Sequence, residues 1–411
     1  MAALSVTTGE PAREIPRRGV FHRRFGRWTP LAHFGFPFAL GPCPTPVARF
    51  RAMARRTRFA GDFKRLFANT VMTLAWPFGA FSTALKTSTR MRRAERLPFS
   101  APVLLNMDWL ALRHSIPPLE YGRYRFDDPE RRKDMHQYVY WNDLPALAAL
   151  NKALGADNRD VQDKDRFAQI CAANGFPHVP TLAVFVGGRQ TYPAAPFIPD
   201  SPVLWTKALR LKGGAGGAKW LKDGEFYSNA QGVRIRADQL AAEFRQCDCL
   251  VQPFIENHPA IARVTNGALA SLRIVTGMNE RGEAEFVASL IALPQGARNS
   301  SVGGILCSID PENGLIRKVA LLSGEPVVNH PDTGMSIPGL ELPFWQESVH
   351  LVCSAHALAF PRFAFLGWDI ALTQDGPLLL ETNSGWGALF HQMLDGPLGH
   401  TAFSRLVGRH V

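Results

Sequence analysis

"LGWDIALTQDGPLLLETNSGWG", residues 366–387, carries three polar side chains within stretches that are otherwise apolar. Asp369 lies in the first apolar run, and Glu381 and Asn383 follow the second. Both runs are apolar on both faces, as buried strands are, and the Gln-Asp-Gly sequence between them has the composition of a hairpin turn. The stretch therefore predicts two paired strands that bring Asp369 close to Glu381 and Asn383.

Two interpretations of this polar trio are open from the hairpin alone. Polar residues of a strand can point to solvent, because successive side chains alternate between the two faces of a sheet. Alternatively, two carboxylates and an amide oxygen that converge require a positive charge between them. A set of oxygen ligands suits Mg²⁺ better than zinc.

Composition sets the class of protein. A chain of 411 residues, 46% hydrophobic and 20% charged, predicts a globular protein of two or three domains. The six cysteines are scattered along the chain without the spacing of a zinc site or a disulfide framework, which favours a reducing compartment. The first 40 residues lack the continuous apolar core of a cleavable signal peptide, so we expect a cytoplasmic protein.

The positive charge is concentrated at the N-terminus. Residues 1–100 contain 18 Lys and Arg against 4 Asp and Glu, whereas the rest of the chain is slightly acidic. The apolar stretch 67–85 is too polar to predict a membrane span. It is compatible either with a helix pair that has a solvated basic face or with peripheral contact at the inner membrane surface, with Trp76, Phe78 and Phe81 inserted. No signal for nucleic-acid binding is present.

The chain changes character along its length. We expect a basic segment at 1–100 and a helical lead-in at 101–160. Helices and strands then alternate in the ranges 161–250 and 251–411. The fold class is therefore α+β after a mainly helical N-terminal region.

A lysine-rich and glycine-rich region follows a strand predicted at residues 203–208. Lys207 lies in that strand, and Lys212 precedes four glycines in the following loop. Glycines let backbone N–H groups approach an anion closely, yet the loop lacks the G-K-S/T of a Walker A motif. It predicts either a flexible connection or a phosphate lid; the glycines are Gly213, Gly214, Gly216 and Gly217.

Two further segments carry polar groups at positions expected to be buried. The extended segment Gln252, Pro253, Phe254 and Ile255 either presents its backbone to a purine, with the glutamine as side-chain reader, or connects two domains. Arg273 lies in an apolar strand, where an arginine requires a bound anion or a carboxylate partner.

The order of these features resembles the ATP-grasp superfamily, and most closely its sugar-transfer-associated branch, near the glutamate-ligase-like proteins. The resemblance covers roughly residues 110–400. It rests on "HPDTG" (330–334), "IPGLELPFW" (337–345) and "GWDIALTQDGPLLLETN" (367–383), with support from "ENHP" and "GALASLRIVT". It implies an ATP-grasp fold, in which two α+β subdomains clasp ATP.

The resemblance also implies roles for individual residues. Lys164 and Lys207 would contact the phosphates of ATP, with Lys212 in the glycine-rich lid. Residues 252–255 would bind adenine. Asp369, Glu381 and Asn383 would bind Mg²⁺, and Arg273 would face the transferred phosphate, so that Arg273 and Lys207 serve catalysis.

Two departures from the family pattern concern the substrates. Gln252 stands where many ATP-grasp enzymes have glutamate, and either Glu256 or Asn257 must serve the ribose. The domain that usually precedes the grasp is replaced by the helical, Arg-rich region.

The implied activity is ATP-dependent ligation of a carboxylate to an amine through an acylphosphate, in cell-surface sugar or polysaccharide modification. The alternatives are an ATP-binding protein without ligase activity and a peripheral membrane scaffold.

Overall fold

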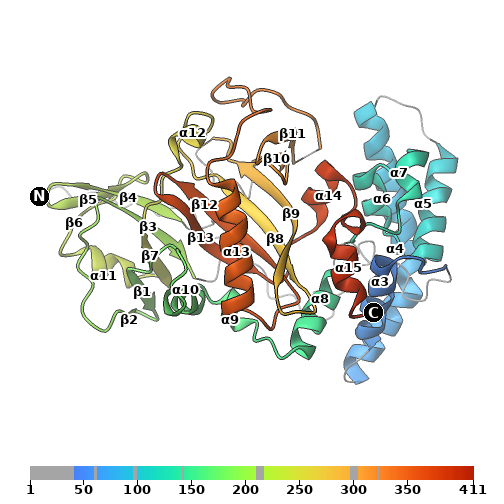
Figure 1. Cartoon of the computed structure of the whole chain (residues 1–411), viewed down its shortest axis with the longest axis horizontal. Helices are drawn as coiled ribbons and strands as arrows, with labels where there is room; N and C mark the ends of the chain where they lie inside the picture. Colours follow the sequence, from blue (N-terminus) through green and yellow to red (C-terminus); the bar gives the residue numbers. More distant parts are fainter. Residues whose placement is uncertain are drawn as a thin grey trace, which may run out of the picture. The chain divides into compact units, whose positions relative to one another are not determined.

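The computed structural model describes residues 41–59, 63–95, 100–140, 143–209, 217–296, 304–322 and 324–411 (Figure 1). The chain forms two compact units. The described residues of the first are 41, 63–95 and 100–122, and those of the second are 42–59 and all that follow 122. Residues 42–59 thus pack with the C-terminal part of the chain. The division into segments 1–100, 101–160, 161–250 and 251–411 remains a prediction, because it follows changes in composition along the sequence and not contacts in the structure.

Among its described residues, the first unit contains α4 (Phe63–Glu95), α5 (Ala101–His114) and most of the short helix α6 (Pro118–Tyr124). Ser100 caps α5, because its hydroxyl accepts a hydrogen bond from the amide of Val103. The helices pack through small buried side chains, with Ala80 of α4 against Ala111 of α5. In the described part of the chain, no helix is both long and apolar enough to cross a membrane.

Helix α3 (Pro46–Phe59) belongs to the second unit, where it packs against α8 (Leu144–Ala153) and α15 (Ala402–Gly408). Short helices lie between residues 118 and 162. They are α6 (Pro118–Tyr124), α7 (Pro129–Lys133) and α9 (Arg159–Gln162).

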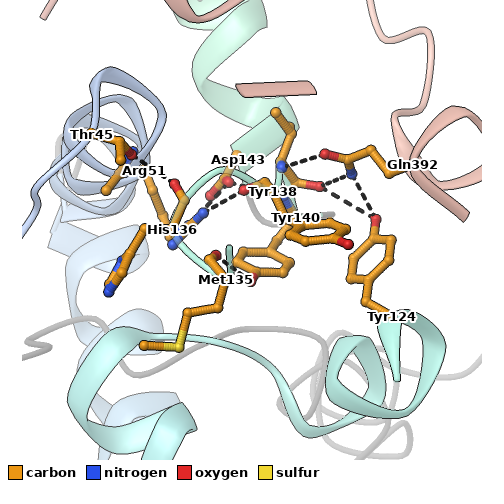
Figure 2. Close-up of polar contacts among 11 residues, drawn as sticks. Thr45, Arg51, Tyr124, Met135, His136, Tyr138, Tyr140, Asp143 and Gln392 are labelled. Atoms are coloured by element: carbon orange, nitrogen blue, oxygen red, sulfur yellow. Dashed lines mark hydrogen bonds and ion pairs between the residues drawn. The ribbon is translucent and has the colours of Figure 1, made fainter. Parts of the chain in front are cut away.

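A buried ion pair attaches α3 to the segment that precedes α8. Arg51 donates from Nε to Oδ2 of Asp143 at 3.2 Å and from Nη2 to the carbonyl of Tyr138 (Figure 2). Its guanidinium carbon lies 4.2 Å from the centre of the Tyr140 ring. Arg51 and Asp143 are almost completely buried, so α3 is an integral part of this unit.

Gln392 of α14 (Leu389–Asp395) connects the same segment to the C-terminal helices. Its amide oxygen accepts from the backbone N–H of Val139, and its amide nitrogen donates to the Val139 carbonyl and to the hydroxyl of Tyr124 (Figure 2). The side chain thereby satisfies two backbone groups that are buried away from water.

The first sheet has seven strands in the order β2-β1-β7-β3-β4-β5-β6, and all neighbours are antiparallel. Its strands are β1 (Ala183–Val186), β2 (Arg189–Tyr192), β3 (Val203–Ala208), β4 (Ala218–Asp223), β5 (Phe226–Asn229), β6 (Arg234–Arg236) and β7 (Cys249–Pro253). One face packs against α11 (Leu240–Phe244) around Phe185, Trp220 and Phe244. Helix α10 (Lys164–Ala173) precedes this sheet in the chain.

The second sheet has six antiparallel strands in the order β11-β10-β9-β8-β12-β13. They are β8 (Ser271–Met278), β9 (Ala284–Leu293), β10 (Ile305–Ile309), β11 (Ile316–Leu321), β12 (Phe365–Thr373) and β13 (Gly376–Asn383). Helix α13 (Trp345–Ala359) covers one face (Figure 1), where it packs on Ile274. Val275, the next residue, packs on the other side with α3 and α15. Both faces are therefore buried, as the apolar strands predict.

Backbone hydrogen bonds tie the first sheet to the β12–β13 hairpin of the second. Leu379 exchanges backbone hydrogen bonds with Pro177 and Val179, which lead into β1. His258, which precedes α12 (Pro259–Ala262), donates its N–H to the carbonyl of Leu372. These bonds hold the segments that flank β1 and β7 beside the β12–β13 hairpin. Among the described residues, the single turn η3 (Leu398–His400) lies between α14 and α15.

Candidate nucleotide and metal site

The β12–β13 hairpin places the predicted acidic residues opposite each other. In the antiparallel register Asp369 pairs with Glu381, and Gly367 pairs with Asn383. The register shifts immediately afterwards, because Ile370 pairs with Leu379 and leaves Leu380 as an extra residue on β13. Such a bulge changes the direction of neighbouring side chains and is common beside active sites. The predicted proximity of Asp369 and Glu381 is therefore confirmed by the strand pairing.

Arg273 of β8 lies on the other side of Asp369. The two residues are register partners, and the guanidinium donates from Nε to Oδ1 at 2.7 Å and from Nη2 to Oδ2 at 2.5 Å. Nη1 also donates to the Trp386 carbonyl at 3.4 Å. Asp369 and burial act in opposite directions on Arg273, and the net effect is a raised pKa. The half-buried arginine has thus found the carboxylate partner that the sequence required.

Four charged groups from four elements act on one another here. Burial raises the pKa of Glu381, and the Asp369 carboxylate raises it further, whereas the charges of Lys207 and Lys164 lower it. Burial in turn lowers the pKa of Lys207, and Glu381 opposes that change. Two carboxylates and two ammonium groups therefore share one partly dehydrated region between the sheets.

Each lysine is held by regular structure. Lys207 lies in β3, opposite Leu250 of β7. Lys164 is the first residue of α10, whose N-cap Asp163 accepts from the amides of Asp165 and Arg166. The start of α10 is kept near the hairpin because α9, just before it, contacts β13.

The glycine-rich lid falls largely outside the described residues. Lys212, Gly213, Gly214 and Gly216 lie in the range 210–216, whereas Gly217 is described and directly precedes β4. One more lysine becomes visible at this edge of the sheet. The ammonium of Lys219 lies 3.9 Å from the centre of the Phe254 ring, so it borders the predicted adenine segment.

Within that segment, the structure distinguishes backbone from side chains. Gln252 is buried, and its amide points toward the Val179 carbonyl, 3.5 Å away. The N–H of Phe254 donates to the Val203 carbonyl. Pro253 ends β7, and Ile255 follows it outside the strand. Gln252 is therefore buried in the first subdomain with its amide toward Val179, and its role as a reader of adenine stays a prediction.

The two candidates for the ribose contact also differ. Asn257 donates to Thr265 and to the Ala268 carbonyl and accepts from the amide of Ala270, so it secures the loop 265–270. Glu256 is exposed. The side chain of Asn257 is committed to internal bonds, which leaves Glu256 as the candidate that can reach a ligand.

Three residues behind the site escaped the sequence reasoning. A Cβ atom on Gly367 would lie 2.2 Å from Cβ of Trp386, so only glycine allows the loop after β13 to fold over β12. The ring of His391 lies beneath, 6.3 Å from the Trp386 ring. Burial, together with the charge of Arg273, lowers the pKa of His391 to about 3, so the ring is neutral. The sequence "SGWG" directly after the acidic strand was the available signal for this packing.

The "HPDTG" motif connects two loops of the second subdomain. His330 Nε2 bonds to the Pro294 carbonyl, and the N–H of Gly296 donates to the Asp332 carboxylate. Thr333 donates its hydroxyl to the Val264 carbonyl. The motif therefore fixes the end of β9 to the loop that follows α12.

The side chains of Asp369, Glu381 and Asn383 suit a hard divalent cation whose other ligands are water or phosphate oxygens. Among the described residues, His, Cys, Asp and Glu do not gather in any group of three or more that could hold a metal ion. Two carboxylates are present, with the amide of Asn383 3.5 Å from Glu381 Oε1. Mg²⁺ usually keeps water or phosphate oxygens and needs only one or two protein carboxylates. The donor set fits that pattern.

Comparison with known proteins identifies the family that the chain resembles. Residues 154–405, more than half of the chain, match the family described as sugar-transfer associated ATP-grasp. The match confirms the superfamily, the branch and the ATP-grasp fold predicted from the motifs, with a helical region before the matched domain. No curated protein matches the chain.

Several solved structures are similar over part of their length. The L-amino acid ligase from Bacillus licheniformis is 12% identical, over 59% of this chain and 45% of that one, with a TM-score of 0.32. The N5-carboxyaminoimidazole synthetase from Staphylococcus aureus is 9% identical, over 60% and 51%, with a TM-score of 0.34. The ATP-grasp ligase PsnB, in complex with a precursor variant, Mg and ADP, is 12% identical, over 71% and 72%, with a TM-score of 0.33. The chain thus spans about half the length of the first two.

Proposed function

The protein belongs to the sugar-transfer associated ATP-grasp family, and from this premise we propose that it is an ATP-dependent ligase that joins a carboxylate to an amine. The observation that carries the proposal is the meeting of Asp369 and Glu381 with Lys207 and Lys164 between the two sheets. Such a region can hold the triphosphate and a divalent cation. The lysine ammonium groups and the metal ion would both balance the negative charge of the phosphates, and the carboxylates would bind the metal.

In this proposal, the nucleotide lies between the first sheet and the β12–β13 hairpin. Lys207 and Lys164 contact the phosphates, and the loop with Lys212, Gly213, Gly214, Gly216 and Gly217 closes over them. The backbone of 253–255 borders the adenine, with Lys219 and Phe254 at its edge. Glu256 is our candidate for the ribose, because Asn257 is committed to its own loop.

We assign Asp369, Glu381 and Asn383 as the protein ligands of Mg²⁺, which would neutralise charge on the phosphates when bound. Asp369 has lone pairs beyond those that accept from Arg273, because each carboxylate oxygen has two. Arg273 holds Asp369 in place and presents positive charge to the transferred phosphate. His391 and Trp386 pack behind this pair and keep the guanidinium oriented.

The proposed reaction has two steps. An oxygen of the substrate carboxylate attacks the γ-phosphorus of ATP, the bond from that phosphorus to the bridging oxygen breaks, and ADP leaves. The amine nitrogen then attacks the carbonyl carbon of the acylphosphate, phosphate leaves, and the nitrogen loses a proton as the amide forms. The protein contributes positioning and electrostatic stabilisation, so no covalent nucleophile is needed.

The family name supports substrates linked to sugars, and we propose a role in cell-surface sugar or polysaccharide modification in the cytoplasm. Two other functions compete with it. A protein that binds ATP without ligating would release no product when supplied with acid and amine. A peripheral scaffold would keep its membrane contact when the nucleotide site is ablated. Peripheral membrane contact is compatible with the ligase activity and is a separate proposal.

The test is an ADP-release screen over amino acids, amino sugars and uronic acids, with ATP and Mg²⁺. The proposal expects a pair of acid and amine that raises ADP release well above the level with ATP alone, together with formation of an amide product by mass spectrometry. Lys207→Met should abolish the increase. Lys222→Met is the matched control, because Lys222 is exposed on β4 and should leave it unchanged. ADP release that no acid and amine pair increases, with ATP binding intact, would favour the non-ligating alternative.

A further inference from the structure

Helix α4 carries an apolar stripe that is exposed in the part of the chain that the structure describes. Leu74, Phe78, Phe81 and Leu85 are 74%, 76%, 51% and 41% exposed. Their spacing of four, three and four residues places them on one face of the helix. Single exposed apolar residues are ordinary, but an aligned series of four large ones marks an interaction surface.

This stripe is separate from the contact between α4 and α5. Ala80 and Ala84 are buried, and Ala80 packs on Ala111 of α5. At 3.6 residues per turn, Ala80 and Ala84 lie about 90–130° around α4 from the centre of the stripe, so they face another way. The stripe is therefore not used to hold the helix pair together.

Helix α5 shows the same pattern on a smaller scale. Leu105, Trp109 and Leu112 are exposed and spaced four and three residues apart. The guanidinium carbon of Arg113 lies 5.5 Å from the centre of the Trp109 ring, and Arg113 itself is exposed. An aromatic ring beside a cation suits the boundary between water and an apolar phase.

The charge of the unit identifies the kind of partner. The sequence of α4 contains six Lys and Arg and a single acidic residue, Glu95. Lys86 is exposed directly after Leu85, as Arg113 is exposed directly after Leu112. Leucine and phenylalanine on one face of a cationic helix are typical of helices that lie in a membrane interface. Anionic lipid headgroups would meet the cations while the stripe enters the acyl boundary.

We propose that the apolar stripes of α4 and α5 dock the protein on an anionic lipid surface, with α4 lying in the plane of the interface. A second copy of the chain is a less suitable occupant, because joining two such faces would bring their positive charges together. This inference deepens the membrane contact proposed above and is independent of the ligase chemistry. It goes beyond the sequence prediction because it adds α5 and fixes which residues of α4 insert.

The test is co-sedimentation of the full-length protein with two kinds of vesicle. One is phosphatidylcholine alone, and the other contains about one-third phosphatidylglycerol, which gives the surface a strong negative potential. The protein should bind the anionic vesicles and release from them as salt is added. Leu74→Ser/Phe78→Ser should bind about tenfold more weakly, because two inserted side chains are lost. Leu105→Ser/Trp109→Ser tests the α5 stripe in the same way.

The matched control is Leu358→Ser, because Leu358 is 70% exposed on α13 in the other unit and should leave vesicle binding unchanged. Circular dichroism and ATP affinity, measured on each variant, show whether the fold is intact. The proposal would be overturned if Leu74→Ser/Phe78→Ser and Leu358→Ser reduced vesicle binding equally. The proposal would also be overturned, in favour of a second copy as the partner, if the unmodified protein formed a dimer and did not bind vesicles, and Leu74→Ser/Phe78→Ser abolished the dimer. Failure of the ligase proposal would show instead as absent ADP release with vesicle binding intact.

Discussion

Replacing Arg51 by methionine is expected to destabilise the second unit strongly, although Arg51 is far from the proposed nucleotide site in sequence. The side chain is 2% exposed, and its ion-pair partner Asp143 is completely buried. Methionine fills a similar volume but removes the hydrogen bonds to Asp143 and to the Tyr138 carbonyl. Asp143 would keep the hydrogen bond donated by the N–H of Tyr140 and lose the charged hydrogen bond from Arg51.

The magnitude follows from the burial of the partner. Breaking a buried ion pair from one side typically costs about 3–5 kcal/mol, since the remaining buried charge loses a favourable charged contact. For a unit of this size, that loss should lower the melting temperature by on the order of 10 °C. Arg51→Met/Asp143→Leu should lose less than the sum of the two single changes, because the pair is removed together.

Denaturant unfolding monitored by circular dichroism and by tryptophan fluorescence measures these differences. Arg49→Met is the matched control on the same helix, since Arg49 is exposed and its replacement should change the free energy of unfolding by less than about 0.5 kcal/mol. If Arg51→Met were as stable as Arg49→Met, α3 would not be an integral part of the second unit. The same reasoning expects a protein that begins near residue 100 to be unstable, because it lacks α3.

Three further outcomes are expected. Lys207→Ala should weaken ATP binding, measured by calorimetry, more than Lys212→Ala does, because Lys207 is fixed on β3; equal affinities would remove Lys207 from the site. Binding of ATP with Mg²⁺ should tighten as pH rises through the raised pKa of Glu381, because the metal requires the carboxylate; an affinity that stays constant as pH rises above the ordinary value of 4.5 would contradict this. Burial lowers the pKa of His356 to about 4 from 6.5, so its contribution to stability is complete above 6.5 and is lost as pH falls toward 4, by about 3 kcal/mol. His356→Gln should flatten this acid loss in unfolding measurements, and an unchanged slope would contradict the assignment.

The hairpin could be predicted from sequence because its signals are local. The two apolar runs, the turn between them and the period of two determine which side chains share a face, so Asp369 and Glu381 were expected together. The partner of Arg273 was predictable in kind, since a buried guanidinium requires an anion. That the partner is Asp369 follows from the pairing of β8 with β12, across almost a hundred residues of sequence.

Features that depend on distant packing were not predictable. The change in composition near residue 100 suggested a boundary, yet the ion pair of Arg51 with Asp143 joins 42–59 to the C-terminal part. The segment 252–255 was recognisable as an extended connection, but the inward direction of Gln252 depends on Val179. The bulge at Leu380 is likewise a property of the pairing of β12 with β13, and neither strand's sequence alone indicates it.

The most direct test of the central claim compares the affinity for ATP with and without Mg²⁺ in the unmodified protein and in Glu381→Gln, by isothermal titration calorimetry. Glu347→Gln is the control, because Glu347 is exposed on α13. We expect Mg²⁺ to tighten ATP binding in the unmodified protein and in Glu347→Gln. In Glu381→Gln the metal should add little, while metal-free ATP binding and the fold persist, because the change keeps the side-chain shape and removes one charge. An undiminished effect of Mg²⁺ in Glu381→Gln would contradict the proposed metal site.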